Sequence, residues 1–127
     1  MHAEHGGGWD YDLELKPSPS PWVRLGWLRA VRRAHARVAA GLDLQVPVLV
    51  LLSLASSLGR TSHEGLRYVD TVIDVDKTAA RAAGLGRHVT IVRVEGALHD
   101  VLRSSPRARR VALNDLTRWL ATYEVAS

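Results

Sequence analysis

Two short apolar runs, at residues 46–53 and 89–94, constrain the fold of this chain more than any other feature. The second run is rich in β-branched residues, which favour strands, and the small residues Gly96 and Ala97 follow it. The first run is apolar at all but its last position, which is typical of a parallel strand covered on both faces. Both runs are therefore predicted to be strands.

Helical segments surround the two predicted strands. Between the strands, an acidic stretch at residues 70–76 leads into a short helix that ends at Gly84. A strand, helix, strand order predicts two parallel strands that lie near each other. Amphipathic helices are predicted before the first strand, at residues 23–40, and after the second, at residues 105–123. The fold class predicted is α/β, with parallel strands and flanking helices.

The composition limits the kinds of protein that the chain can be. With 127 residues, 46% of them hydrophobic, the chain suits one domain with a core. The absence of cysteine excludes disulfides, thiolate zinc sites and a cysteine nucleophile. It also fits a reducing compartment, so we expect a cytoplasmic protein. No apolar run is long enough to span a membrane, and the first residues do not resemble a secretory signal.

The basic residues are unevenly distributed along the chain. They number 17, for a net charge of +4, and nearly all of them are arginines, which is typical of a GC-rich genome. Arg29, Arg33 and Arg37 follow one face of the helix at residues 23–40. We interpret this face as solvated and expect no nucleic-acid partner. A rival hypothesis is that the chain is a small basic binding module, without enzymatic activity, that uses this arginine-rich helix.

Residues 1–22 are polar and rich in glycine, proline and serine, so we interpret them as an irregular arm. His2 and His5 lie three residues apart in this arm. Because no third ligand stands at a recognised spacing, we interpret them as two solvated histidines. We expect neither a metal site nor a cofactor.

An aspartate and a histidine follow the two predicted strands. His99 lies on the loop after the second strand, and Asp70 lies at the end of a long loop after the first. The carboxyl ends of parallel strands open on the same rim of a sheet, so the two side chains can meet there. Such a pair can serve as an acid and a general base. The alternative is that Asp70 caps a turn and that His99 is an ordinary loop residue.

The order of these parts resembles a known family. In chain order, the parts are PVLVL, an aspartate, a helix, VTIVRVEGALHD and a terminal amphipathic helix. Together they are similar to the carboxyl-terminal part of α/β-hydrolases, in the serine aminopeptidase or lysophospholipase-like branch. The resemblance implies that Asp70 is the acid and His99 the general base of a Ser-Asp-His triad, with Asp74 as a competing acid. It also implies that residues 1–22 end a cap region and that residues 23–127 form the last part of a hydrolase domain.

The nucleophile of that family has no counterpart in this chain. Its GxSxG elbow is absent, and no serine is flanked by glycines at that spacing. The resemblance therefore implies that the serine and the oxyanion loop lie upstream, in a remainder of the hydrolase fold that would be the partner of these residues. The substrates implied are small molecules with an ester, lipid or peptide-like acyl group. Ser56 and Ser57, after the first strand, are the first serines to test as an internal nucleophile.

Overall fold

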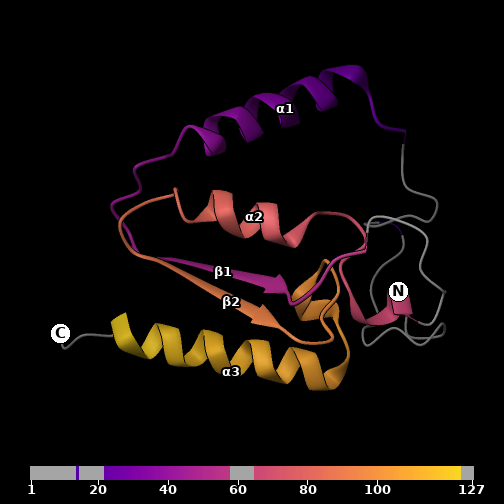
Figure 1. The fold of residues 1–127 in the computed structure, drawn as a ribbon, viewed down its shortest axis with the longest axis vertical. Coiled ribbons are helices and arrows are strands. Elements are labelled where there is room, and N and C mark those ends of the chain that lie inside the picture. The colour runs from indigo at the N-terminus through magenta and orange to yellow at the C-terminus, as the bar shows by residue number, and fades with distance from the viewer. Residues whose placement is uncertain (1–13, 15–21, 58–64, 124–127) are drawn as a thin grey trace.

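A computed structural model describes residue 14 and residues 22–57 and 65–123 of the chain. Apart from residues 14 and 22, the predicted arm with His2 and His5 lies outside the described residues. The described elements, in chain order (Figure 1), are α1 (Leu25–Ala39), β1 (Val48–Ser53), the 3-10 turn η2 (Gly65–Tyr68), α2 (Val75–Ala82), β2 (Val89–Val94), the 3-10 turn η3 (Val101–Arg103) and α3 (Pro106–Tyr123).

The two strands are parallel neighbours, as the strand, helix, strand order predicts. Their register runs from Val48 opposite Val89 to Ser53 opposite Val94. A parallel pair needs a crossover connection, and α2 lies within it. The carboxyl ends of both strands therefore open on the same rim. The described residues form a small α/β fold of three helices and a two-stranded parallel sheet.

Helices α2 and α3 begin where the local sequence favours a helix start. Before α2, the side chain of Asp74 accepts a hydrogen bond of 3.0 Å from the backbone N–H of Lys77. Such a cap satisfies one of the four N–H groups that a helix start leaves without a partner. Helix α3 begins at Pro106, whose fixed φ suits the first helical position. None of the described helices is long and apolar enough to cross a membrane.

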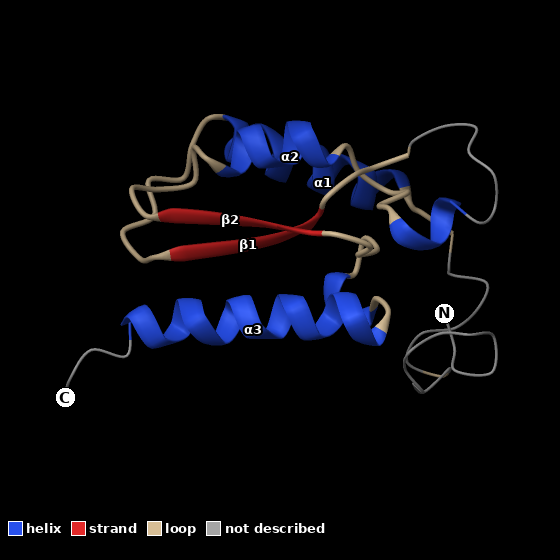
Figure 2. Ribbon diagram, turned by 60° about the horizontal axis from the view of Figure 1, so that its bottom comes forward, coloured by secondary structure: helices blue, strands red, loops and turns tan. Residues whose placement is uncertain are grey.

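The sheet lies between two layers of helix (Figure 2). Helix α3 covers one face, and α2 lies over the other, with α1 on the same side as α2. The main core lies under α3, where small residues of the helix allow it to approach β2 closely. Its buried members are Val94, Ala97, Val101, Ala108 and Ala112, with Leu51 and Val92 packed against them.

The first strand is less buried than its apolar sequence predicts. Leu52 and Ser53 are buried, but the earlier positions of β1 are only half-buried, and Val46, just before the strand, is 62% exposed. Because the described sheet has two strands, each strand has one edge without a backbone partner. Helices do lie on both faces of β1, as predicted, but among the described residues they bury only the carboxyl end of the strand fully.

Candidate active site

The chain leaves β1 on a long excursion and returns to the carboxyl end of that strand at Asp70. The backbone N–H of Asp70 donates to the carbonyl of Ala55 at 2.9 Å, and the N–H of Ser57 donates to the carbonyl of Asp70 at 2.8 Å. Ser56 and Asp70 form a parallel bridge just beyond β1. Asp70 is thus distant from the strand in sequence but fixed beside its end in space.

The turn after β2 brings the second loop to the same place. Gly96 has a φ of +70°, a conformation that glycine adopts without steric cost. Ala97 follows it and is fully buried. The hydroxyl of Ser53, at the end of β1, donates a hydrogen bond of 2.7 Å to the carbonyl of Ala97. This buried bond ties the start of the loop after β2, which carries His99 and is called the histidine loop here, to the neighbouring strand.

A second serine fixes the residues on either side of His99. The buried Ser104 hydroxyl accepts a hydrogen bond of 2.8 Å from the backbone N–H of Leu98. It also lies 3.3 Å from the carbonyl of Asp100, to which it can donate. His99 therefore projects from a backbone that is held at the residue before it and at the residue after it.

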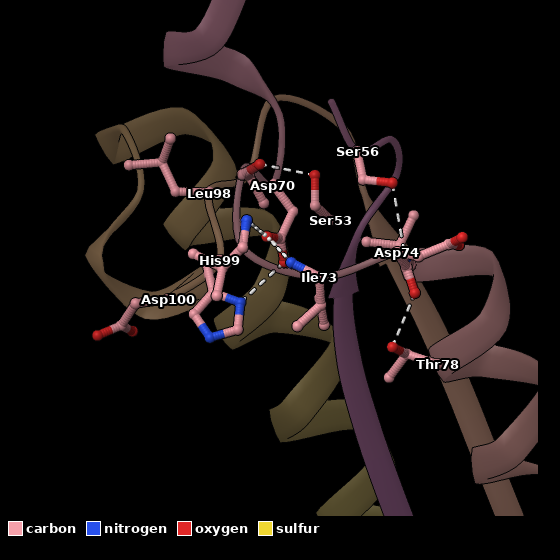
Figure 3. Close-up of polar contacts among 12 residues, drawn as sticks. Ser53, Ser56, Asp70, Ile73, Asp74, Thr78, Leu98, His99 and Asp100 are labelled. Atoms are coloured by element: carbon pink, nitrogen blue, oxygen red, sulfur yellow. Dashed lines mark hydrogen bonds and ion pairs between the residues drawn. The ribbon is translucent and has the colours of Figure 1, made fainter. Parts of the chain in front are cut away.

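The two loops bring Asp70 and His99 into direct contact (Figure 3). The Oδ2 atom of Asp70 lies 2.9 Å from the Nδ1 atom of His99. The Asp70 side chain is 2% exposed, whereas the His99 side chain is 48% exposed. A buried carboxylate thus orients an imidazole ring that remains open to the surface. The predicted proximity of an aspartate and His99 is confirmed.

The second carboxylate oxygen of Asp70 is held by the backbone. Oδ1 accepts hydrogen bonds from the N–H groups of Val72, at 2.7 Å, and Ile73, at 3.0 Å. Burial raises the pKa of Asp70, but the backbone bonds from Ile73 and Val72 and the contact with His99 together hold this pKa below its ordinary value. Asp70 is therefore ionised at neutral pH and acts only as an acceptor.

The charge on Asp70 determines where the proton of a neutral His99 lies. Because an ionised carboxylate cannot donate, the hydrogen bond between Oδ2 and Nδ1 requires a proton on Nδ1. The lone pair of the neutral ring then lies on Nε2, which is the arrangement that a general base needs. The pair can thus accept a proton at Nε2 and stabilise the resulting imidazolium.

Asp74, the competing acid, has a different place in the structure. One of its oxygens accepts the backbone N–H of Lys77, and the other lies 3.1 Å from the Nζ atom of Lys77. These bonds with Lys77 lower the pKa of Asp74. Asp74 is therefore a helix cap, and Asp70 is the carboxylate that contacts His99.

The serines near the site have structural partners. The Ser56 hydroxyl accepts a hydrogen bond of 3.3 Å from the N–H of Val75, at the start of α2. Ser53 and Ser104 bind the histidine loop, as described above. No hydroxyl of a described serine lies within hydrogen-bond distance of His99.

An open hollow of about 350 Å³ lies beside the imidazole ring. Apolar side chains from both loops contribute to its lining, together with the polar and charged groups near His99. The lining residues are Leu66, Val69, Thr71, Leu98, His99, Asp100 and Arg103. The ring of His99 therefore faces a space with both apolar and polar walls.

Sequence reasoning missed the two serines that position His99. Ser53 carries a signal that a closer reading can use, because a polar residue at the end of an apolar strand is buried and must find a hydrogen-bond partner. Ser104 carries no such signal, since its role depends on how the loop folds back. The described residues contain no cluster of three or more histidine or acidic side chains suited to a metal ion.

The comparisons with known proteins add no assignment, because no family model, no curated protein and no solved structure matches this chain.

Proposed function

We propose that this chain is the carboxyl-terminal part of a serine hydrolase of the α/β-hydrolase type, in the serine aminopeptidase or lysophospholipase-like branch. Asp70 serves as the acid and His99 as the general base of its triad. The observation that carries the proposal is the 2.9 Å contact between Asp70 Oδ2 and His99 Nδ1. The chain order supports it as well, since the acid follows one strand and the histidine follows the next.

The chemistry of the site follows from the position of the two ring nitrogens. Nε2 of His99 takes the proton of a serine hydroxyl as that oxygen attacks the acyl carbon of the substrate. The negative charge of Asp70 stabilises the imidazolium that forms. The ring then returns the proton to the leaving group, which completes the first half of the reaction. The substrate is a small molecule with an ester, lipid or peptide-like acyl group.

The nucleophile belongs to the remainder of the hydrolase fold. The Ser53, Ser56 and Ser104 hydroxyls already have structural partners, and none of them contacts His99. In the described sheet, β1 pairs with β2 on one edge only. The other edge of β1 can accept a further parallel strand, and the strand that bears the nucleophile belongs on that side.

The chain alone should not hydrolyse esters at an enzymatic rate. Removing the nucleophile from a serine hydrolase leaves only binding and the oxyanion hole, and both of these belong mainly to the remainder of the fold. We expect the purified chain and its His99→Ala variant to show the same background rate with a short-chain aryl ester. The measurement is the initial rate of phenol release.

A turnover of about 1 s⁻¹ that disappears in His99→Ala would contradict the proposal that the chain supplies only the acid and the histidine of the triad. It would require a nucleophile within the chain. Ser56→Ala and Ser57→Ala are the variants that would locate it, because both serines lie just after β1. Labelling of the wild-type chain by a fluorophosphonate would lead to the same conclusion by a covalent readout.

A further inference from the structure

Helix α1 is the element least used by the fold. None of its residues is buried, and only Val31 and Val38 are half-buried. These two valines lie seven residues apart, on one side of the helix. Helix α1 lies beyond α2, at the outside of the molecule (Figure 1). All the other residues of α1 are exposed.

One exposed side of α1 combines apolar and basic side chains. Six residues at helical spacing line a shallow hollow along it, and we call them the Leu–Arg face: Leu25, Leu28, Arg29, Arg32, Arg33 and Ala36. Leu25 is 85% exposed, and Trp22, just before the helix, is 97% exposed. Leu25 and Leu28 are thus exposed side by side in the same hollow, which makes them a patch and not isolated surface residues.

The charge of this helix has a single sign. Residues 24–39 contain no acidic side chain, and their basic side chains are Arg24, Arg29, Arg32, Arg33 and Arg37. None of these arginines forms an ion pair within the described part of the chain. The positive charge of α1 is thus available to an external partner.

We propose that the Leu–Arg face binds the surface of an anionic lipid bilayer, with α1 lying in the plane of the interface. Interfacial helices combine a basic side with exposed leucine and tryptophan side chains and have a low overall hydrophobicity. The arginines contact lipid phosphates, while Leu25 and Trp22 enter the boundary between headgroups and acyl chains. Nucleic acid fits less well, because phosphate contacts alone leave exposed leucines in water.

This surface is separate from the site at Asp70 and His99, and its test does not require hydrolase activity. The test measures sedimentation of the purified chain with vesicles of phosphatidylcholine alone and with about 30% phosphatidylserine. We expect binding to the anionic vesicles only, and we expect it to weaken as salt rises from about 0.05 to 0.5 M.

The triple variant Arg29→Gln, Arg32→Gln, Arg33→Gln should lower the affinity for anionic vesicles on the order of a hundredfold. The matched control, Arg87→Gln, Arg107→Gln, Arg110→Gln, removes the same charge from other exposed positions. It should lower the affinity less than about tenfold. Leu25→Ser with Leu28→Ser should weaken binding by tenfold or more, since both side chains lose apolar contact.

Three results would overturn the proposal. The first is equal binding to vesicles with and without phosphatidylserine. The second is an equal loss of affinity in the two triple variants. The third is tighter binding to duplex DNA than to anionic vesicles, with no effect of the double leucine variant, which would assign the face to nucleic-acid phosphates. Because no residue of α1 is buried, the arginine and leucine variants in α1 should keep the far-ultraviolet dichroism of the wild type.

Discussion

Replacing His99 by alanine in a polypeptide that also carries the nucleophile should lower kcat for a short-chain aryl ester on the order of 10⁶-fold. The proposed source of the nucleophile is the segment encoded in frame directly upstream of Met1. In the described part of the chain, the other partners of the Asp70 side chain are backbone N–H groups, which cannot take the proton of the attacking serine. A loss of this size is expected when one member of a triad is removed. The measurement is steady-state hydrolysis by the joined polypeptide and by its His99→Ala variant.

Two aspartate variants separate the roles of the neighbouring carboxylates. Asp70→Asn should lower kcat roughly 10⁴-fold, because it disturbs the tautomer of His99 while keeping the shape of the site. Asp74→Asn should leave the rate close to that of the wild type, since Asp74 caps α2 and pairs with Lys77.

The proposal fails if His99→Ala retains most of the activity. It also fails if the upstream segment lacks a strand, a GxSxG elbow and a helix.

Replacing Asp70 by alanine should reduce the free energy of unfolding by about 2 to 6 kcal/mol. The carboxylate accepts backbone bonds from Val72 and Ile73, and its loss leaves both N–H groups in a part-buried place without that acceptor. Each such group costs about 1 to 3 kcal/mol. Asp70→Asn should cost less, because its carbonyl oxygen can still accept from both groups. Urea unfolding of the two variants measures the difference.

The lowered pKa of Asp70 also predicts how stability changes with pH. The unfolded chain takes up a proton at this residue at a higher pH than the folded chain does. The stabilisation from Asp70 is therefore present above the unfolded pKa, near pH 4. It is lost as the pH falls through the lower, folded pKa. Asp70→Asn should remove this part of the pH dependence of stability. If the free energy of unfolding of Asp70→Asn fell with decreasing pH as steeply as that of the wild type, the assignment would be contradicted.

The sequence predicts the regular elements well because their signals are local. The β-branched run at residues 89–94 coincides with β2, and the Ser–Pro start after residue 104 coincides with the start of α3. Burial depends on neighbouring elements, and here sequence reasoning fails. The sequence predicts α1 as an amphipathic helix, yet Trp27 remains 58% exposed, because α1 packs mainly against α2 among the described elements.

The candidate pair could be predicted from chain order and from the geometry of parallel strands. The choice between Asp70 and Asp74 could not, because both follow the same long loop. The choice depends on the bridge between Ser56 and Asp70, which returns the chain to the end of β1. It also depends on the bond from Ser53 to Ala97, which joins residues far apart in sequence. The local sequence indicates at most that Ser53 needs a partner, and it does not indicate which residue that partner is.

The central claim is that Asp70 holds the proton of neutral His99 on Nδ1 and leaves Nε2 as the base. Asp70→Asn is an informative control. Its carbonyl oxygen is needed by Val72 and Ile73, so its NH₂ group faces the ring and can only donate to Nδ1. This variant should therefore carry the opposite tautomer.

The measurement that tests this claim most directly is a long-range ¹H–¹⁵N correlation spectrum of the purified chain, recorded as the pH is raised until the ring of His99 is neutral. We predict that His99 carries its proton on Nδ1 in the wild type and on Nε2 in Asp70→Asn. A neutral wild-type ring protonated on Nε2, or the same tautomer in both proteins, would contradict the account.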